Sequence, residues 1–352
     1  MKFRYLTILL LFFTIYSVFL SNITKEINIK GPDLITMNSR KIVSSNSISP
    51  YKTTDTYISD IKKVDFKFTS VGISWYEYLP LGTKVEMSVK FLVDDEWTEW
   101  IETDEDLDLF QDDPDSVRKY ALALTNPANA VQYKFTLFGD GKNSPFIKSV
   151  DSHFIKSGKM MSIPKLIKGK YASSNSNSTL SNLSNPVGII DRETWGANES
   201  YRYLSNNLIE PILVDLGDDF YEKFSDELKI DRIVEHDENG DKYKWPLQYP
   251  EEIKKIIVHH TASTKNLDDP MQAMRDIYYY HAISRGWGDI GYNYIIDTAG
   301  NIYEGRFGGE GVIAAHSGPA NHGSIGIAVL GNYQSDQVPE AVTNSLNKLI
   351  NL

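Results

Sequence analysis

Two adjacent histidines, His259 and His260, follow an apolar run in the stretch IIVHHTAS. The chain has 7 histidines, and most of them gather in one C-terminal region, namely His259, His260, His281, His316 and His322. Imidazole groups bind metals and transfer protons near neutral pH, so this cluster is compatible with a metal or acid–base site and equally with a set of structural histidines. Neighbouring side chains on a strand point to opposite faces, so we expect only one of the adjacent pair to reach such a site. The residues alone leave open which one.

The elements that position these histidines alternate between strand and helix patterns. We expect strands over the apolar stretches 254–260, 292–297, 301–306 and 324–333. Asp269 and Pro270 are typical of an N-cap and a first helical turn, so a helix should follow them. A second helix should end the chain. Interleaved strands and helices predict an α/β domain.

The region before this domain has a different pattern. Apolar and polar residues alternate over 84–91 and 131–137, which predicts strands with one buried face. Several such strands between turn signals favour a small all-β sandwich. Residues 173–185 are almost entirely Ser, Asn and Thr, a composition typical of a flexible linker. Asn239-Gly240 predicts a β-hairpin within an insert whose function the sequence does not reveal.

Composition excludes several classes of function. The formal net charge of -11 argues against nucleic acid as a partner, because such binding depends on Lys and Arg that neutralise phosphates. The chain has no cysteine, which excludes disulfides and thiolate zinc ligands within it.

The first residues indicate export. Lys2 and Arg4 precede an uncharged apolar run over 5–20, which is typical of a signal peptide or a retained N-terminal membrane anchor. We therefore expect an extracellular or cell-envelope protein. The expected organisation is a signal or anchor over 1–22, a polar tether over 23–51, the β-sandwich over 52–157, a linker over 158–186 and the α/β domain over 187–352.

Four motifs of the last domain occur together in a known family: DRETWGA, IKKIIVHHTAS, SRGWGDIGYNYIIDTAGNIYEGR and AAHSGPANHGSIGIAVLGNY. Their order and register resemble the peptidoglycan recognition proteins and the related zinc N-acetylmuramoyl-L-alanine amidases, which include phage lysozyme-type amidases. The resemblance covers about residues 187–350. It implies a mixed β-sheet flanked by helices, with a groove for the stem peptide of peptidoglycan and a zinc ion at its floor.

The resemblance also implies roles for particular residues. His259 falls on a zinc ligand, His260 becomes a packing residue, and Tyr292 falls on the catalytic tyrosine beside the metal. Zinc lowers the pKa of bound water, and Tyr292 would stabilise the oxyanion as the amide between N-acetylmuramic acid and L-alanine is cut. The residues implied to bind the substrate are His316, His322, Trp287 and Arg306.

One part of the family pattern is missing. The family takes a second zinc histidine and a third ligand from a segment after the last helix, and no histidine follows His322 here. We therefore expect that the given chain lacks its C-terminal end. Three functions stay open: a zinc amidase of the bacterial cell wall, a non-catalytic module that binds muramyl peptide, and a surface factor whose sandwich does the work.

Overall fold

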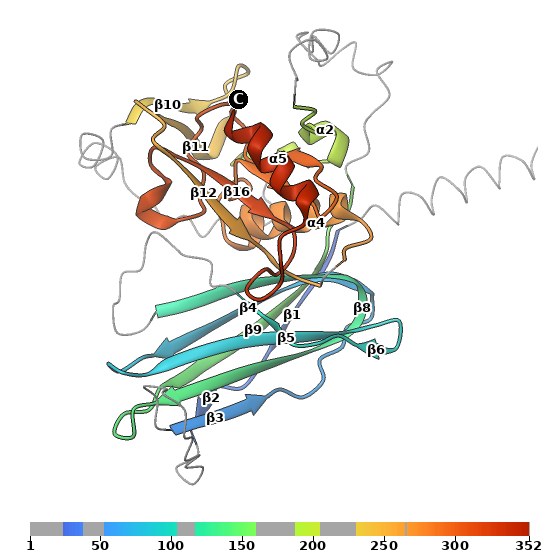
Figure 1. The fold of residues 1–352 in the computed structure, drawn as a ribbon, viewed down its shortest axis with the longest axis vertical. Coiled ribbons are helices and arrows are strands. Elements are labelled where there is room, and N and C mark those ends of the chain that lie inside the picture. The colour runs from blue at the N-terminus through green and yellow to red at the C-terminus, as the bar shows by residue number, and fades with distance from the viewer. Residues whose placement is uncertain are drawn as a thin grey trace, which may run out of the picture.

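The structure is a computed structural model, and it describes residues 24–37, 53–103, 117–159, 187–204, 230–264 and 266–351. An antiparallel β-sheet module forms one half of the molecule, and a domain of strands and helices lies against it (Figure 1). Residues 1–22 and the linker stretch 173–185 lie outside the described residues. Within the described part of the chain, no helix is long and apolar enough to cross a membrane.

The N-terminal module is built on one continuous sheet in the order β1-β9-β4-β8-β5-β6, with β2, β3 and β7 pairing at its sides. Its strands are β1 (Lys25–Lys30), β2 (Leu34–Thr36), β3 (Thr53–Ile58), β4 (Phe68–Tyr78), β5 (Lys84–Val93), β6 (Glu96–Trp97), β7 (Ile101–Glu102), β8 (Val117–Gly139) and β9 (Phe146–Lys156). The period-two stretches do fall in strands, β5 and the second half of β8.

The long strand β8 explains how one sheet encloses a core. Its first part pairs with β4 and its second part with β5 and β3. The register shifts between these parts, at a segment that includes Pro127, which has no N–H to give to the ladder. Trp75 on β4 therefore packs against Phe135 on the second part of β8, with ring centroids 5.3 Å apart. The expected sandwich is thus a single bent sheet that encloses its core.

The expected tether over 23–51 is wrong for its first residues. Strand β1 pairs antiparallel with β9, and so does β2. Ile35 is buried in the module core, and Ile29 packs against that core. The side chains of β1 are otherwise mostly exposed, so backbone bonds to β9 hold this strand rather than a visible apolar pattern.

The C-terminal domain contains a four-stranded mixed sheet in the order β12-β16-β14-β15. Its strands are β12 (Lys255–His260), β14 (Tyr294–Ile296), β15 (Ile302–Glu304) and β16 (Ser324–Val329). Strand β16 is parallel to both β12 and β14, and β15 is antiparallel to β14. Helix α4 (Pro270–Tyr279) packs on the face that carries Ile295 and Ala328, and α5 (Glu340–Ile350) covers the face of Ile327 and Val329. The α/β prediction is confirmed.

Shorter helices complete this domain: α2 (Arg192–Trp195), the 3-10 turns η3 (Glu199–Arg202) and η5 (Gly318–Asn321), and the π-helical turn η4 (Tyr280–Ser284). Asp269 caps α4 as expected, because its side chain accepts a hydrogen bond from the Gln272 backbone N–H at 2.9 Å. The chain continues directly from α4 into η4, and the loop that follows leads to Tyr292.

The insert contains the expected hairpin, formed by β10 (Ile230–His236) and β11 (Lys242–Pro250). Gly240 has φ +85°, a left-handed conformation that glycine adopts without steric cost. The hairpin lies over the loop after η4, since a Cβ at Gly288 would sit 3.2 Å from the Cβ atoms of Lys244 and Trp245.

The two halves of the molecule share a continuous junction. The two-residue strand β13 (Ala262–Ser263) follows β12 and pairs in parallel with Ala123 and Leu124 of β8. Leu124 and Ile155 of the N-terminal module belong to the same apolar cluster as helix α4. The sheet that carries the adjacent histidines is therefore joined directly to the N-terminal sheet.

Candidate functional site

The face of the mixed sheet that meets α4 brings three of the expected site residues together. His259 Nε2 lies 3.0 Å from His316 Nδ1. The Tyr292 ring centroid is 5.5 Å from that of His259 and 6.5 Å from that of His316. All three side chains are partly exposed. Of the two adjacent histidines, His259 is the one whose side chain lies with His316 and Tyr292.

His260 lies on the opposite face of β12. Its Nδ1 accepts a hydrogen bond from the backbone N–H of Tyr333 at 2.9 Å, and the two rings lie 6.4 Å apart. Because successive side chains of a strand point to opposite faces, His259 and His260 have different neighbours.

A close approach to the backbone of β16 holds His316 in place. A Cβ at Gly326 would lie 2.3 Å from His316 Cδ2, so only glycine leaves room for this ring. Asn321 Oδ1 accepts hydrogen bonds from the backbone N–H groups of His316 (2.9 Å) and Ser317 (2.7 Å). The loop 316–321 is therefore fixed by its own side chains.

The hydrogen-bond pattern assigns the protons of the histidine pair. The Ser324 hydroxyl has the backbone carbonyls of Ala320 (2.8 Å) and Asn321 (2.9 Å) as acceptors for its one proton, which favours His316 Nε2–H as the donor to its oxygen at 3.3 Å. His316 Nδ1 is then the acceptor, and His259 Nε2–H donates to it. Burial, together with the neighbouring His259, lowers the pKa of His316 to about 3, which keeps its ring neutral.

Behind Tyr292 lies a buried row of rings. The His281 ring is 5.8 Å from Tyr292 and 4.8 Å from Trp287. His281 Nδ1 accepts a hydrogen bond from the Gly291 backbone N–H at 3.0 Å, which anchors the chain next to Tyr292. Burial lowers the pKa of His281 to about 3, with Arg285 and Arg306 as further causes. This histidine is neutral and supports Tyr292.

Two residues expected to bind substrate are instead buried. Trp287 is 8% exposed and packs against His281, and Arg306 is 3% exposed with its Nη2 directed at the Trp287 carbonyl oxygen, 3.4 Å away. Such burial favours a structural role for both side chains. His322 is half-buried at the end of η5, and burial lowers its pKa, with Lys255 as a further cause.

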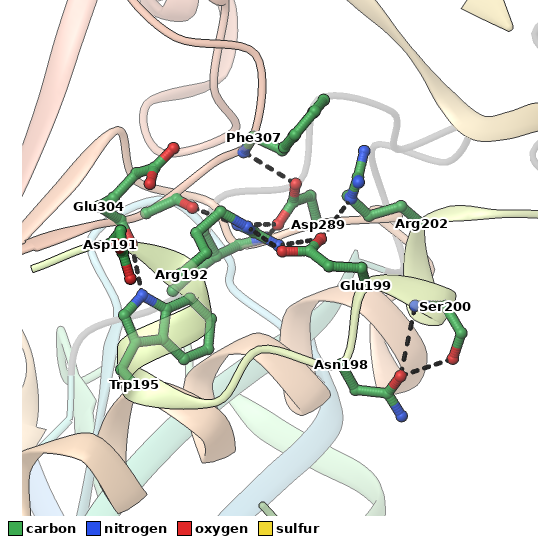
Figure 2. A network of polar contacts seen from close by, with 12 residues as sticks. Asp191, Arg192, Trp195, Asn198, Glu199, Ser200, Arg202, Asp289, Glu304 and Phe307 are labelled. Carbon is green, nitrogen blue, oxygen red and sulfur yellow. Dashed lines mark hydrogen bonds and ion pairs between the residues drawn. The ribbon is translucent and has the colours of Figure 1, made fainter. Parts of the chain in front are cut away.

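A buried network of charges fixes the loop that leads to Tyr292 (Figure 2). Arg192 Nη1 donates to Asp289 Oδ1 at 3.0 Å, and Arg192 Nε donates to Glu199 at 2.8 Å. Asp289 also accepts from the backbone N–H groups of Ile290 (2.7 Å) and Phe307 (3.0 Å). Arg192 and Asp289 side chains are only 5% and 4% exposed. The motifs around residues 192 and 289 thus meet as one structural unit.

The N-terminal module closes one side of the site. A small cavity of about 40 Å³ adjoins Tyr292 and His281, and Leu122 and Leu124 of β8 form part of its wall. Its volume is of the order of a single water molecule. Sequence reasoning missed these leucines, because strand periodicity does not tell which distant strand will pair with β13.

The described residues do not complete a hydrolytic metal site. Among them, no group of three or more His, Cys, Asp or Glu side chains is placed to hold a metal ion. A catalytic zinc takes three protein ligands and keeps a fourth position open, whereas His259 and His316 offer two facing nitrogens. The role of His259 as a zinc ligand stays a prediction.

Comparisons with known proteins agree with the motifs in the last domain. Residues 249–352 match the family described as N-acetylmuramoyl-L-alanine amidase. The chain is 36% identical over 110 residues to peptidoglycan-recognition protein SC1a/b of Drosophila simulans, covering 31% of this chain and 58% of that protein. It is 33% identical over 125 residues to peptidoglycan-recognition protein LB of Drosophila melanogaster, covering 35% and 48%. The solved structure of wild-type Drosophila PGRP-LB aligns at 34% identity with 29% of this chain and 61% of its own, with a TM-score of 0.27. The chain spans about half the length of the curated relatives it matches.

Proposed function

We propose that the C-terminal domain binds the muramyl-peptide part of peptidoglycan, because residues 249–352 match the N-acetylmuramoyl-L-alanine amidase family and the chain is similar to peptidoglycan-recognition proteins. The observation that carries the proposal is the convergence of His259, His316 and Tyr292, with His259 and His316 nitrogens 3.0 Å apart. Binding takes place on the α4 face of the sheet, where these partly exposed side chains meet.

The chemistry of these side chains suits a peptide attached to a sugar. Amide groups of the ligand offer N–H donors and carbonyl acceptors, and a tyrosine hydroxyl can serve as partner to either. The rings of Tyr292 and His259 add apolar contact beside these polar groups. Because the buried network and His281 fix the loop before Tyr292, the backbone that carries this side chain is held in place before the ligand arrives.

Hydrolysis of the amide between N-acetylmuramic acid and L-alanine is a second candidate function. The family description and the proximity of Tyr292 to His259 favour it. In such a reaction, Tyr292 donates a hydrogen bond to the developing oxyanion. The apolar run over 5–20 supports the further proposal that the protein is exported to the compartment where this polymer lies.

The test of binding uses the whole chain and insoluble peptidoglycan sacculi. We expect the chain to sediment with sacculi, and His259→Ala and Tyr292→Phe to weaken this binding at least about fivefold, as each removes a polar contact. His236→Ala, at an exposed position of β10, is the matched control and should bind normally. Failure of the unaltered chain to sediment with sacculi contradicts the proposal.

Hydrolysis is tested separately by measuring new L-alanine amino groups released from sacculi, with and without added zinc. Release that disappears in His259→Ala supports the amidase. Binding without any release at either zinc concentration supports recognition alone.

A further inference from the structure

A cavity of about 480 Å³ lies between the N-terminal module and the C-terminal domain. Strands β1, β4, β8 and β9 form one wall, while η4 and strand β11 form the other. Its volume lies within the range of small-ligand sites, which often occur between domains. It is a different cavity from the small one beside Tyr292.

The acidic side chains of this cavity already have partners. Asp151 Oδ2 accepts from Arg118 Nη2 at 3.2 Å. Glu26 Oε2 bonds to His153 Nε2 at 2.7 Å, and this hydrogen bond is the main cause that lowers the pKa of Glu26. Both carboxylates are therefore largely compensated by neighbours in the same wall.

Two lysines in the lining lack such compensation. Lys30 on β1 and Lys244 on β11 line the cavity from opposite sides, and neither forms an ion pair with the residues that the structure describes. Burial lowers the pKa of Lys244, as expected for an ammonium group that has lost part of its water without gaining an anion. An anionic ligand would stabilise both charges. The cavity is thus locally basic in a chain of net charge -11.

Two guanidinium groups of the lining lie close to the same aromatic ring. Arg285 lies over the Tyr120 ring at 3.4 Å and Arg118 lies 5.5 Å from the same ring. Stacking of this kind orients the planar guanidinium groups, whose paired donors match the two oxygens of a carboxylate. Both arginines line the cavity, and each comes from a different half of the molecule.

We propose that this interdomain cavity binds a carboxylate-bearing ligand of short-peptide size, held by Lys30 and Lys244 and aligned by Arg285. Carboxylate is favoured over phosphate because Glu26 and Asp151 stand in the same lining and repel the two charges concentrated on one phosphate group more strongly than the single charge of one carboxylate, whereas separate carboxylates can each face a different lysine. The proposal goes beyond muramyl-peptide binding on the α4 face of the sheet, and it holds whether or not that face binds its ligand.

The probe is the peptide triglutamate, titrated into the whole chain by isothermal calorimetry at low salt. We expect saturable binding that weakens as salt rises, and no binding of N-acetyl-triglutamine amide, a peptide of the same length without any carboxylate. The double variant Lys30→Gln/Lys244→Gln should weaken binding about tenfold or more, since it removes two charged hydrogen-bond donors. Lys244→Arg keeps the charge and should bind within about threefold of the unaltered chain.

Two control variants separate this site from others. Lys25→Gln also lies on β1 but does not line the cavity, and it should bind triglutamate normally. His259→Ala should do the same, even if it loses binding to sacculi. The proposal is overturned if triglutamate does not bind, if N-acetyl-triglutamine amide binds equally well, if the lysine double variant changes nothing, or if inorganic phosphate displaces triglutamate at lower concentration than acetate does.

Discussion

The contribution of the junction between the two halves to stability can be tested at Asp276 on helix α4, through the pH dependence of the free energy of unfolding. Its side chain is fully buried. Oδ2 accepts from the Thr69 hydroxyl at 2.5 Å, and Oδ1 accepts from the Ser157 backbone N–H at 2.8 Å and from Gln272 Nε2 at 3.0 Å. Thr69 and Ser157 belong to the N-terminal module, so this carboxyl group bonds across the junction.

The magnitude of its effect follows from its pKa. Burial raises the pKa of Asp276 from 3.8 to about 6, although the three hydrogen bonds oppose this shift. A shift of roughly two units corresponds to about 3 kcal/mol between the protonated and ionised forms. Because the pKa of Asp276 is higher in the folded state than in the unfolded state, the protonated carboxyl group favours the folded state over the ionised one by this amount. The contribution to stability is fully present below pH 3.8 and is lost as the pH rises through about 6.

The substitution Asp276→Asn should remove this pH dependence. Asparagine keeps an oxygen for Ser157 and Gln272, and its NH₂ group can donate to the Thr69 hydroxyl oxygen. The free energy of unfolding is measured by urea titration with tryptophan fluorescence from about pH 2.5 to pH 7, a range that extends below the ordinary pKa of 3.8 of both Asp276 and the control residue Asp140. We expect the variant to gain about 3 kcal/mol relative to the unaltered chain over this range.

Asp140→Asn serves as a control of opposite sign. Hydrogen bonds from the backbone of Asn143 and Lys142 lower the pKa of the exposed Asp140, so stability from this residue is lost as the pH falls. The variant should therefore lose stability relative to the unaltered chain as the pH rises. A difference for Asp276→Asn that stays constant with pH, or that changes in the same direction as for Asp140→Asn, refutes the reasoning.

Two further substitutions test the packing around the site. Asp289→Asn removes the buried partner of Arg192 and should destabilise the protein by about 3 kcal/mol or more, measured as a lower melting temperature in calorimetry; an unchanged melting temperature would contradict the role of the network. Gly72→Ala places a Cβ 2.4 Å from Cε2 of Tyr280 and should cost about 1–3 kcal/mol in urea unfolding, whereas a cost below about 0.5 kcal/mol would mean that the junction yields easily.

Local sequence patterns predicted most of the elements near the site. The apolar stretch before His259, the Asp269-Pro270 start of α4 and the Asn239-Gly240 turn each act through neighbouring residues, and each lies where it was expected. Strands β1 and β2 escaped prediction because they are held by pairing with β9, about 120 residues later in the chain. The pattern of apolar and polar residues within a mostly polar stretch does not indicate that a distant strand will pair with it.

The site shows the same division between local and distant causes. The resemblance of the motifs to the family predicted that His259, Tyr292 and His316 lie in one site. The contact between the two histidines depends on the parallel pairing of β12 with β16, in which His259 lies opposite Ala328 and Ile257 lies opposite Gly326. The burial of Trp287 and Arg306 depends on packing of the whole chain around the loop after η4, which no short motif encodes.

The position of His259 is set by two sheets and not by one. Thr261, two residues later, donates its backbone N–H to the Val329 carbonyl at 3.0 Å, which ties the end of β12 to β16. The next residues form β13, which pairs with β8, and the Thr264 backbone N–H donates to the Leu124 carbonyl at 3.1 Å. A displacement of the N-terminal module would therefore pull directly on the strand that carries His259, while also withdrawing Leu124 from the wall beside Tyr292. The N-terminal module is thus part of the architecture of the site, and the buried hydrogen bonds from Thr69 and Ser157 to Asp276 join this module to helix α4.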